Sequence, residues 1–229
     1  MNTGATVPPA VSSRRLVATL GLTALISGVL IVSAYEITLP RIEENKRLAL
    51  EQAVYQVLPA ATTRHSFVVT PAGLIPTDSP TPDGPAVHAG YDPAGRLVGI
   101  AAEASARGYQ DIIRLLYAYS PECECITAIS VLRNNDTPGI GDKITKDPEF
   151  RANFKALAAR LNPERTALAH AIVTVKHGKK TEAWQIDAIS GATISSRAVG
   201  KALNDSAQLL VPKVQAQLVV LEQKPREGK

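Results

Sequence analysis

Apolar and polar positions divide the chain into an uncharged N-terminal run, an amphipathic segment and a long remainder of short alternating stretches. Residues 16–35 carry no charged side chain, and a helix of about 20 residues spans the roughly 30 Å hydrocarbon core of a bilayer. After Pro40, apolar side chains recur at helical spacing until Pro59 ends the pattern. The pattern therefore predicts a single N-terminal transmembrane helix over 16–35 and a juxtamembrane helix over 36–60.

A cleaved secretory signal is the competing interpretation of the N-terminal run. Arg14 and Arg15 form a basic region before it, and residues 32–34 have the small-x-small spacing of a cleavage site. The run is longer than the apolar core of such a signal, which is usually about 7–15 residues, so a retained anchor is preferred. Basic residues flank both ends of the run, and their distribution alone does not orient it in the membrane.

Short alternating stretches between turn-forming residues predict a sheet in the middle of the chain. A loop is expected over residues 77–85, which are rich in proline. The expected strands cover residues 86–91, 96–103, 111–119 and 125–133, the first two joined by a turn at 92–95.

The last third of the chain predicts further helices and a strand pair. Asp147 caps a helix that is expected to run to about Leu161. Residues 169–176 and 181–189 alternate as in a hairpin. A final helix is expected from Thr193 or Ser195 towards Glu222, with a kink or break at Pro212. These elements predict an α+β fold, with a mostly antiparallel sheet flanked by helices.

Composition excludes several classes of function. The 229 residues fit one domain beside the membrane segment, and a net charge of +4 spread along the chain does not indicate nucleic acid as a partner. Cys123 and Cys125 are the only cysteines, too few for an iron–sulfur or structural metal centre in one chain. A disulfide is chemically permitted if the domain lies outside the cytoplasm. Because residues two apart in a strand do not face each other, unpaired or strained thiols at a loop edge are the preferred expectation. We identify no metal site and no catalytic residues, and whether the chain is an enzyme by itself is left open.

Two segments carry candidate chemistry. Residues 187–196, DAISGATISS, place small residues and hydroxyls where a strand leads into a helix, an arrangement suited to a phosphate group. A helix start capped by serine is the simpler alternative. Residues 135–144, NDTPGIGDKI, form a tight loop with two glycines that lets backbone approach a flat ligand; taken alone, this segment is only a turn.

The first segment resembles a known motif. Asp187-x-x-Ser190-Gly191-Ala192-Thr193-x-Ser195 is similar to the flavinylation motif of FMN-binding domains, which occur in the G subunits of Rnf-type electron-transport complexes and the C subunits of sodium-pumping NADH:quinone oxidoreductases. Residues 135–144 resemble the Glu-Thr-Pro-Gly-Leu-Gly loop of the same family, with Asp136 in place of glutamate. The resemblance extends in order over most of the chain.

The resemblance implies a covalent FMN, joined by a phosphoester to Thr193 by a separate flavin transferase that uses FAD. It assigns Asp187 to transferase recognition or to orienting the turn. Whether the serines bind the phosphate or cap the helix is left open, and Tyr109 and Trp184 are the next places to look for the pocket. The cofactor-binding residues expected from both motifs are Thr137, Pro138, Gly139, Ile140, Gly141, Ser190, Gly191, Ala192, Thr193, Ser195 and Ser196.

The function implied by the resemblance is electron transfer within an ion-translocating ferredoxin:NAD oxidoreductase complex. The implied topology is a single-pass protein of the inner membrane, with a cytoplasmic tail at 1–15 and an extracytoplasmic FMN-binding domain at 61–229. Expected partners are the other membrane subunits of the complex, the transferase and membrane lipid. The alternative is a membrane-tethered extracytoplasmic binding or scaffold module without flavin.

Overall fold

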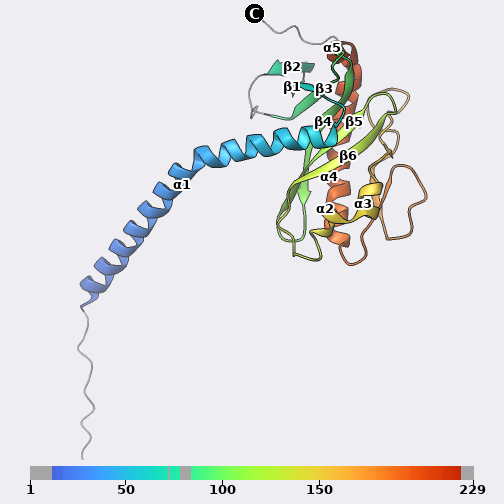
Figure 1. Ribbon diagram of the computed structural model, residues 1–229. Coiled ribbons are helices and arrows are strands. Elements are labelled where there is room, and N and C mark those ends of the chain that lie inside the picture. The colour runs from blue at the N-terminus through green and yellow to red at the C-terminus, as the bar shows by residue number, and fades with distance from the viewer. Residues whose placement is uncertain (1–11, 72, 78–83, 223–229) are drawn as a thin grey trace, which may run out of the picture. The chain divides into compact units, whose positions relative to one another are not determined.

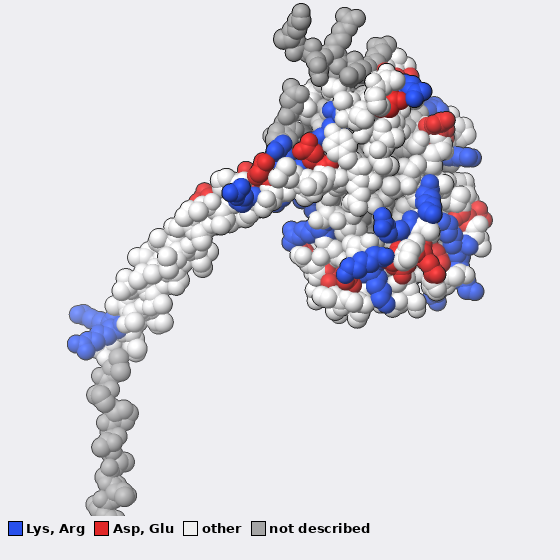
Figure 2. Space-filling model, viewed as in Figure 1, with Lys and Arg blue, Asp and Glu red and all other residues white. Residues whose placement is uncertain are grey.

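The computed structural model describes residues 12–71, 73–77 and 84–222, in two compact units that divide between Lys46 and Arg47. Helix α1 (Ser13–Val57) begins in the first unit and ends in the second. It joins the predicted span over 16–35 and most of the helix predicted over 36–60 in one helix, which ends at Val57 and has Pro40 inside it. Figure 2 shows its long uncharged stretch between a basic cluster at the start and a segment of mixed charge.

The apolar part of α1 has the length and composition of a membrane span. An 18-residue window reaches a mean hydropathy of 2.2, and none of it is buried inside the protein. Such a window also fits a signal sequence near an N-terminus. The predicted span is therefore confirmed as a helix.

The second unit is built on a seven-stranded sheet in which all neighbours are antiparallel (Figure 1). The strand order is β2-β1-β3-β4-β5-β6-β7. The strands are β1 (Thr63–Thr70), β2 (Gly73–Thr77), β3 (Ala86–Tyr91), β4 (Leu97–Arg107), β5 (Ile112–Ser120), β6 (Cys125–Arg133) and β7 (Leu157–Ala158). The predicted antiparallel sheet is confirmed, and two of the four predicted strands have the bounds expected for them.

Strands β1 and β2 were not predicted, because prolines obscured their pattern. Pro76 lies in β2 opposite Phe67 of β1, and β2 is the edge strand, where a residue without an N–H is tolerated. Of the loop expected over 77–85, residues 78–83 lie outside the described residues.

The two faces of the sheet are covered by different helices. Helix α4 (Thr193–Ala216) packs against β4 and β5 over the larger core (Figure 1), which includes Ala102, Leu115 and Tyr117. The end of α1 and the segment after it cover the other face, with Val54 and Leu58 in a smaller core. Because side chains alternate along a strand, neighbouring residues of β4 and β5 belong to different cores.

Asn153 ends the helix predicted over 147–161. Helix α3 (Pro148–Ala152) begins as expected, with the Asp147 carboxylate accepting a hydrogen bond from Phe150 N at 2.9 Å, but it stops at Ala152. The Asn153 side chain accepts from Asp187 N at 3.0 Å and donates to Asp187 O at 3.2 Å. The chain then leaves the helix and supplies β7 to the sheet, so the prediction of a helix to Leu161 was wrong.

The predicted hairpin over 169–189 was also wrong. Strands β8 (Val173–Val175) and β9 (Gln185–Asp187) pair in parallel. Parallel strands need a connection longer than a hairpin turn, and residues 176–184 provide it. Short helix α2 (Lys143–Lys146) follows the glycine loop.

Helix α4 begins at Thr193, one of the two predicted starts, and continues through Pro212. Val211 and Val214, on either side of Pro212, are buried in the larger core, and this packing outweighs the lost backbone hydrogen bond. The break comes at Gln217, after which α5 (Leu218–Glu222) forms a last turn. The break predicted at Pro212 is therefore displaced.

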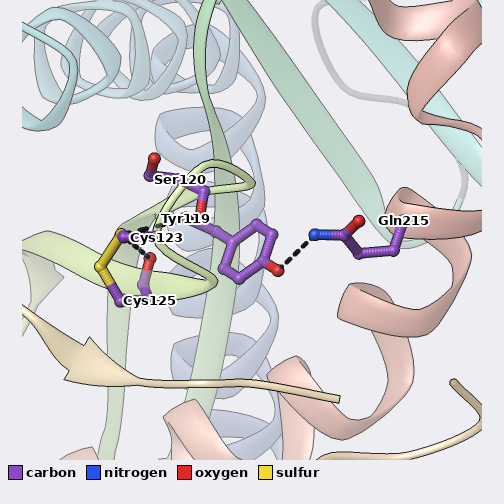
Figure 3. Close-up of a disulfide and its surroundings, with 5 residues drawn as sticks. All are labelled: Tyr119, Ser120, Cys123, Cys125 and Gln215. Carbon is purple, nitrogen blue, oxygen red and sulfur yellow. Dashed lines mark hydrogen bonds between the residues drawn. A yellow bond between two sulfur atoms is a disulfide. The ribbon is translucent and has the colours of Figure 1, made fainter. Parts of the chain in front are cut away.

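The turn between β5 and β6 contains a disulfide between Cys123 and Cys125 (Figure 3). Their Cα atoms are 5.2 Å apart, within the usual range for a disulfide. Cys123 lies in a turn rather than in a strand, and Glu124 has a positive φ of 48°, which brings the two side chains together. The expectation of unpaired thiols was wrong because it assumed an extended chain.

Candidate functional site

The two motif segments, far apart in the sequence, line one open cleft of about 430 Å³ at the N-terminal end of α4. A volume of this size lies within the range of small-molecule sites. The lining residues are Tyr109, Asp136, Thr137, Ile140, Gly141, Gly191, Ala192, Thr193, Ile194 and Ser195.

A hydrogen bond between Ser195 and Asp136 joins the two segments. The Ser195 hydroxyl donates to Asp136 Oδ2 at 2.5 Å, and both residues are buried. Asp136 Oδ1 also accepts from Gln110 N at 2.9 Å. Burial opposes ionisation of this carboxyl, but the hydrogen bonds from Ser195 and from backbone N–H groups outweigh burial and hold the pKa of Asp136 below its usual value. Asp136 is therefore a carboxylate whose charge is already compensated by donors.

The glycine loop packs closely against this hydrogen bond at Gly141, which has no side chain. A Cβ atom placed on Gly141 would lie 2.4 Å from Asp136 Cβ and 3.0 Å from Ser195 Oγ. Gly139 has a φ of +79° with open space around it, so its requirement is conformational. Its N–H donates to Asp142 Oδ1 at 2.7 Å. The two glycines thus serve different purposes, one for close packing and one for the turn.

The start of α4 leaves backbone donors near the cleft. Gly191 adopts a φ of +81°, and Ala192, at the N-cap position, provides no side-chain hydrogen bond to the helix. Thr193 is the first helical residue and is half-buried. Within the described residues, no hydrogen bond occupies the Thr193 hydroxyl. The N-terminus of a helix carries free N–H groups and a partial positive charge, which favour a phosphate.

Ser190 and Ser196 are not part of the cleft lining. Ser196 Oγ donates to Ala192 O at 2.9 Å and accepts from Ile189 N at 3.1 Å, so it fixes the junction between β9 and α4 from inside. Ser190 is exposed and lines a second, smaller pocket of about 240 Å³ together with Asp187. The structure therefore separates the three serines that the sequence left together.

Asp187 orients a neighbouring turn. Its carboxylate accepts from Gly178 N at 3.0 Å and from Lys179 N at 3.4 Å, and it lies 3.6 Å from His177 Nδ1. Of the two expected roles, this geometry supports orienting the turn, and transferase recognition stays a prediction.

Sequence reasoning gave too little weight to two residues of the cleft. Tyr109 was considered only as a second place to look for the pocket, and it lines the cleft. Trp184, considered with it, does not line the cleft and stacks on His170, with ring centroids 3.8 Å apart. Asp136 was noted only for replacing a glutamate. Nothing local in the sequence points to its pairing with Ser195, which lies 59 residues away. Pro138 and Gly139, expected in the site, do not line the cleft.

The chemistry of the lining fits a flat aromatic ring with a phosphate tail. Tyr109, Ile140 and Ile194 expose 63%, 51% and 53% of their surface, an apolar area suited to a ring system. Asp136 is the only charged side chain among the described lining residues. A phosphate here would therefore be held by backbone N–H groups and hydroxyls rather than by a lysine or arginine.

Comparison with known proteins gives two family regions and one fold. A model of the FMN-binding domain matches residues 108–208, and a model of the RnfG N-terminal region matches residues 1–57. The G subunit of the ion-translocating oxidoreductase complex of Methanosarcina acetivorans is 29% identical over 194 residues, which cover 84% of this chain and 91% of that protein. The G subunit of the proton-translocating ferredoxin:NAD(+) oxidoreductase complex of Clostridium ljungdahlii is 28% identical over 189 residues, 82% of this chain and 86% of that protein.

Among solved structures, NqrC of Shewanella oneidensis superposes with a TM-score of 0.59 at 19% identity, over 78% of this chain and 98% of that chain. At this level of identity the match shows the fold alone. The α+β fold expected from the sequence is therefore the NqrC fold, with an apolar helix at the N-terminus.

Proposed function

Because the chain belongs to the RnfG family of Rnf-type complexes and contains the FMN-binding domain of that family, we propose that it is a membrane-anchored electron-transfer protein with FMN attached to Thr193. The observation that carries this proposal is the position of Thr193. It is the first residue of a long helix without a side-chain cap, in a cleft that both motif segments line.

Attachment requires the Thr193 hydroxyl to act as a nucleophile. In the proposed step, Thr193 Oγ1 attacks the phosphorus of the FMN half of FAD, the pyrophosphate bond breaks, and AMP leaves with the bonding electrons. Asp136, the only carboxylate among the described lining residues, already accepts a hydrogen bond from Ser195. The base that takes the Thr193 proton is therefore assigned to the transferase, and Gly191 and Ala192 leave room for it.

After attachment, the chain positions the cofactor. Bound FMN supplies the capacity to accept and release one or two electrons, which is chemistry of the flavin itself. The N-terminus of α4 would compensate the charge of the phosphoester. Tyr109, Ile140 and Ile194 would cover part of the ring, and the bond from Ser195 to Asp136 would keep loop and helix together.

The proposed topology places residues 61–229 on the extracytoplasmic side, with the tail 1–15 in the cytoplasm. The span at 16–35 then lies among lipids and the other membrane subunits of the complex. The disulfide supports this placement, because disulfides persist in oxidising compartments and are rare in the cytosol.

Co-expression with a flavin transferase tests the attachment. The parent should give a fluorescent band after denaturing electrophoresis and a mass increased by one FMN bound as a phosphoester. Thr193→Ala should lose both signals, and Thr137→Ala, a matched change in the same cleft, should keep them. Covalent flavin retained by Thr193→Ala would overturn the assignment.

A binding or scaffold module without flavin is the second candidate. Its basis in the sequence, a helix start capped by serine, is not found, because Ala192 is the N-cap residue and no side chain among the described residues caps α4. A parent protein that stays free of flavin, beside a second substrate that the same transferase labels, would support this candidate. N-terminal sequencing of membrane-extracted protein tests the anchor, because a mature chain beginning at Tyr35 means a cleaved signal.

A further inference from the structure

We propose that the Cys123–Cys125 disulfide is a thiol–disulfide exchange site, a two-electron redox group separate from the flavin site. Its substrate class is a dithiol, either a small molecule or a protein with two neighbouring cysteines. This proposal does not depend on Thr193 or on the presence of FMN.

The two sulfur-bearing residues differ in accessibility. Cys123 is exposed at the turn between β5 and β6, whereas Cys125 begins β6 and is only 5% exposed. An incoming thiolate therefore reaches the Cys123 sulfur first. Attack on that sulfur makes Cys125 the leaving group. The difference in accessibility therefore determines which sulfur is attacked.

The disulfide contributes little to the stability of the fold. It closes a loop of only three residues, and the stabilisation by a disulfide grows with the length of the loop that it closes. The strands beside it are already paired, since Ser120 is opposite Cys125 in the β5–β6 ladder and Ala158 of β7 is opposite Cys125 on the other side. The hairpin therefore does not need the bond in order to form.

The turn is linked to α4 by a chain of polar contacts, so its redox state has a structural consequence. Glu124, between the two cysteines, has a positive φ and lies 4.0 Å from Arg165, which itself has a φ of 57°. Arg165 donates to Gln215 Oε1 at 2.9 Å. Gln215 in turn donates to the hydroxyl of Tyr119 at 2.8 Å, in the strand that leads into the turn (Figure 3). Breaking the disulfide removes the covalent constraint on Glu124, which is the first residue in this series of polar contacts.

The exchange conserves atoms and electrons in two steps. A thiolate of the dithiol forms a bond to Cys123 Sγ, the Cys123–Cys125 bond breaks, and Cys125 leaves as a thiolate that takes up a proton. The second thiolate of the dithiol then attacks its own mixed-disulfide sulfur and releases Cys123, which is protonated. The dithiol is oxidised to a disulfide, and the chain gains two electrons and two protons.

The first experiment uses the full chain in detergent, equilibrated with mixtures of reduced and oxidised dithiothreitol. Free thiols are trapped with a maleimide that adds mass. We expect a reversible transition from no tags to two tags per chain, with an unchanged circular dichroism spectrum. Tags that appear only when a denaturant unfolds the protein would overturn the proposal.

The second experiment tests the asymmetry with two matched variants. Cys125→Ser leaves the exposed thiol and Cys123→Ser leaves the buried one. With oxidised glutathione, Cys125→Ser should form the mixed disulfide at least about tenfold faster, since exchange depends on access to the sulfur. Equal rates, or the opposite order, would overturn the proposed direction of attack.

A spectroscopic signal separates exchange in the folded protein from local unfolding. Ala158, opposite Cys125, donates its N–H to Ala183 O, next to Trp184, the only tryptophan. We expect Trp184 emission to change little on reduction, because β6 and β7 stay paired. An emission shift to that of the unfolded chain on reduction would show that the bond is structural and would overturn the proposal.

Discussion

The two faces of the central sheet are covered in different ways. On the α4 face, large side chains pack against the helix, and two tyrosine hydroxyls bond to it: Tyr117 contacts Ser206 Oγ at 3.1 Å, and Tyr119 accepts from Gln215. A third tyrosine, Tyr91, donates to Leu221 O of α5 at 2.7 Å. Burial raises the pKa of Tyr91 to about 12, so its hydroxyl keeps its proton.

On the other face, the segment after α1 approaches the backbone of the sheet. Gly90 of β3 and Gly99 of β4 are direct neighbours in register, and a Cβ atom on either would lie 2.9 Å from a methyl group of Leu58. Alanines complete this smaller core, together with a buried histidine, His88.

This difference indicates where a site can be built. The α4 face uses directional bonds along the helix, and these hold its first residue, Thr193, within reach of a loop from elsewhere in the chain. The α1 face uses close approach, which attaches one segment firmly through apolar contacts. Four substitutions test this difference, in order of decreasing expected effect.

Replacing Asp136 with alanine should have the largest effect. The change leaves the buried Ser195 hydroxyl and the Gln110 N–H without their acceptor. Because both are hydrogen bonds to a carboxylate, worth about 2 kcal/mol each, their loss should lower the free energy of unfolding by about 4 kcal/mol. Urea denaturation measures the loss. Asp136→Asn, which keeps an acceptor oxygen, is the control and should lose less than half as much stability. Equal losses would mean that the charge of Asp136 is essential, rather than its hydrogen bond from Ser195.

Acid should destabilise the α1 face through His88. Burial, with Arg64 nearby, lowers the pKa of His88 from 6.5 to about 4. Well above pH 6.5 the histidine is neutral in both states, and its full contribution to stability is present. As the pH falls towards 4, the unfolded chain binds a proton that the folded chain does not, so stability drops by about 3 kcal/mol.

The measurement is urea denaturation between pH 8 and pH 4. His88→Gln should flatten the profile in this window, although the substitution also disturbs the contact with Ser66. Carboxylates with a lowered pKa, such as Asp136, lose their contribution only below about pH 4, so they do not mask the result. An unchanged slope in the variant would remove His88 from the explanation.

Gly99→Ala should cost about 2 kcal/mol by overpacking against Leu58. Leu58→Ala creates space at the same point, so the double variant should lose less than the sum of the two single variants. Thermal or urea unfolding of all four proteins gives the coupling. Additive losses would show that Leu58 is not the residue that requires glycine here.

Tyr117→Phe should have the smallest effect, about 1 kcal/mol, because it removes one neutral hydrogen bond. Ser206 keeps its bond to Glu103 O at 3.0 Å, so no donor is left unsatisfied. The variant should also keep the proposed covalent flavin, since Ser206 lies near the middle of α4 and Thr193 at its start. A loss of several kcal/mol would mean that the α4 face depends on its tyrosine hydroxyls more than on apolar packing.

Much of the fold could be predicted because its signals are local. Strands β3 and β6 follow from alternation between turn residues, and the start of α3 follows from Asp147 and Pro148. The predictions failed where distant residues decide. Asn153 ends α3 by pairing with the backbone of Asp187, and an edge position permits Pro76 in β2.

For the candidate site, the order of residues was enough to select two candidate segments, because small residues, hydroxyls and glycines within ten positions are a local pattern. Their role in holding a cofactor stays a prediction. Folding in three dimensions was needed to join these segments through Asp136 and Ser195, to hold Ser190 and Ser196 apart from the cleft, and to close the disulfide in a turn. Periodicity and capping depend on neighbours along the chain. The hydrogen bond between Ser195 and Asp136, 59 residues apart, forms only after α4 has packed against the sheet.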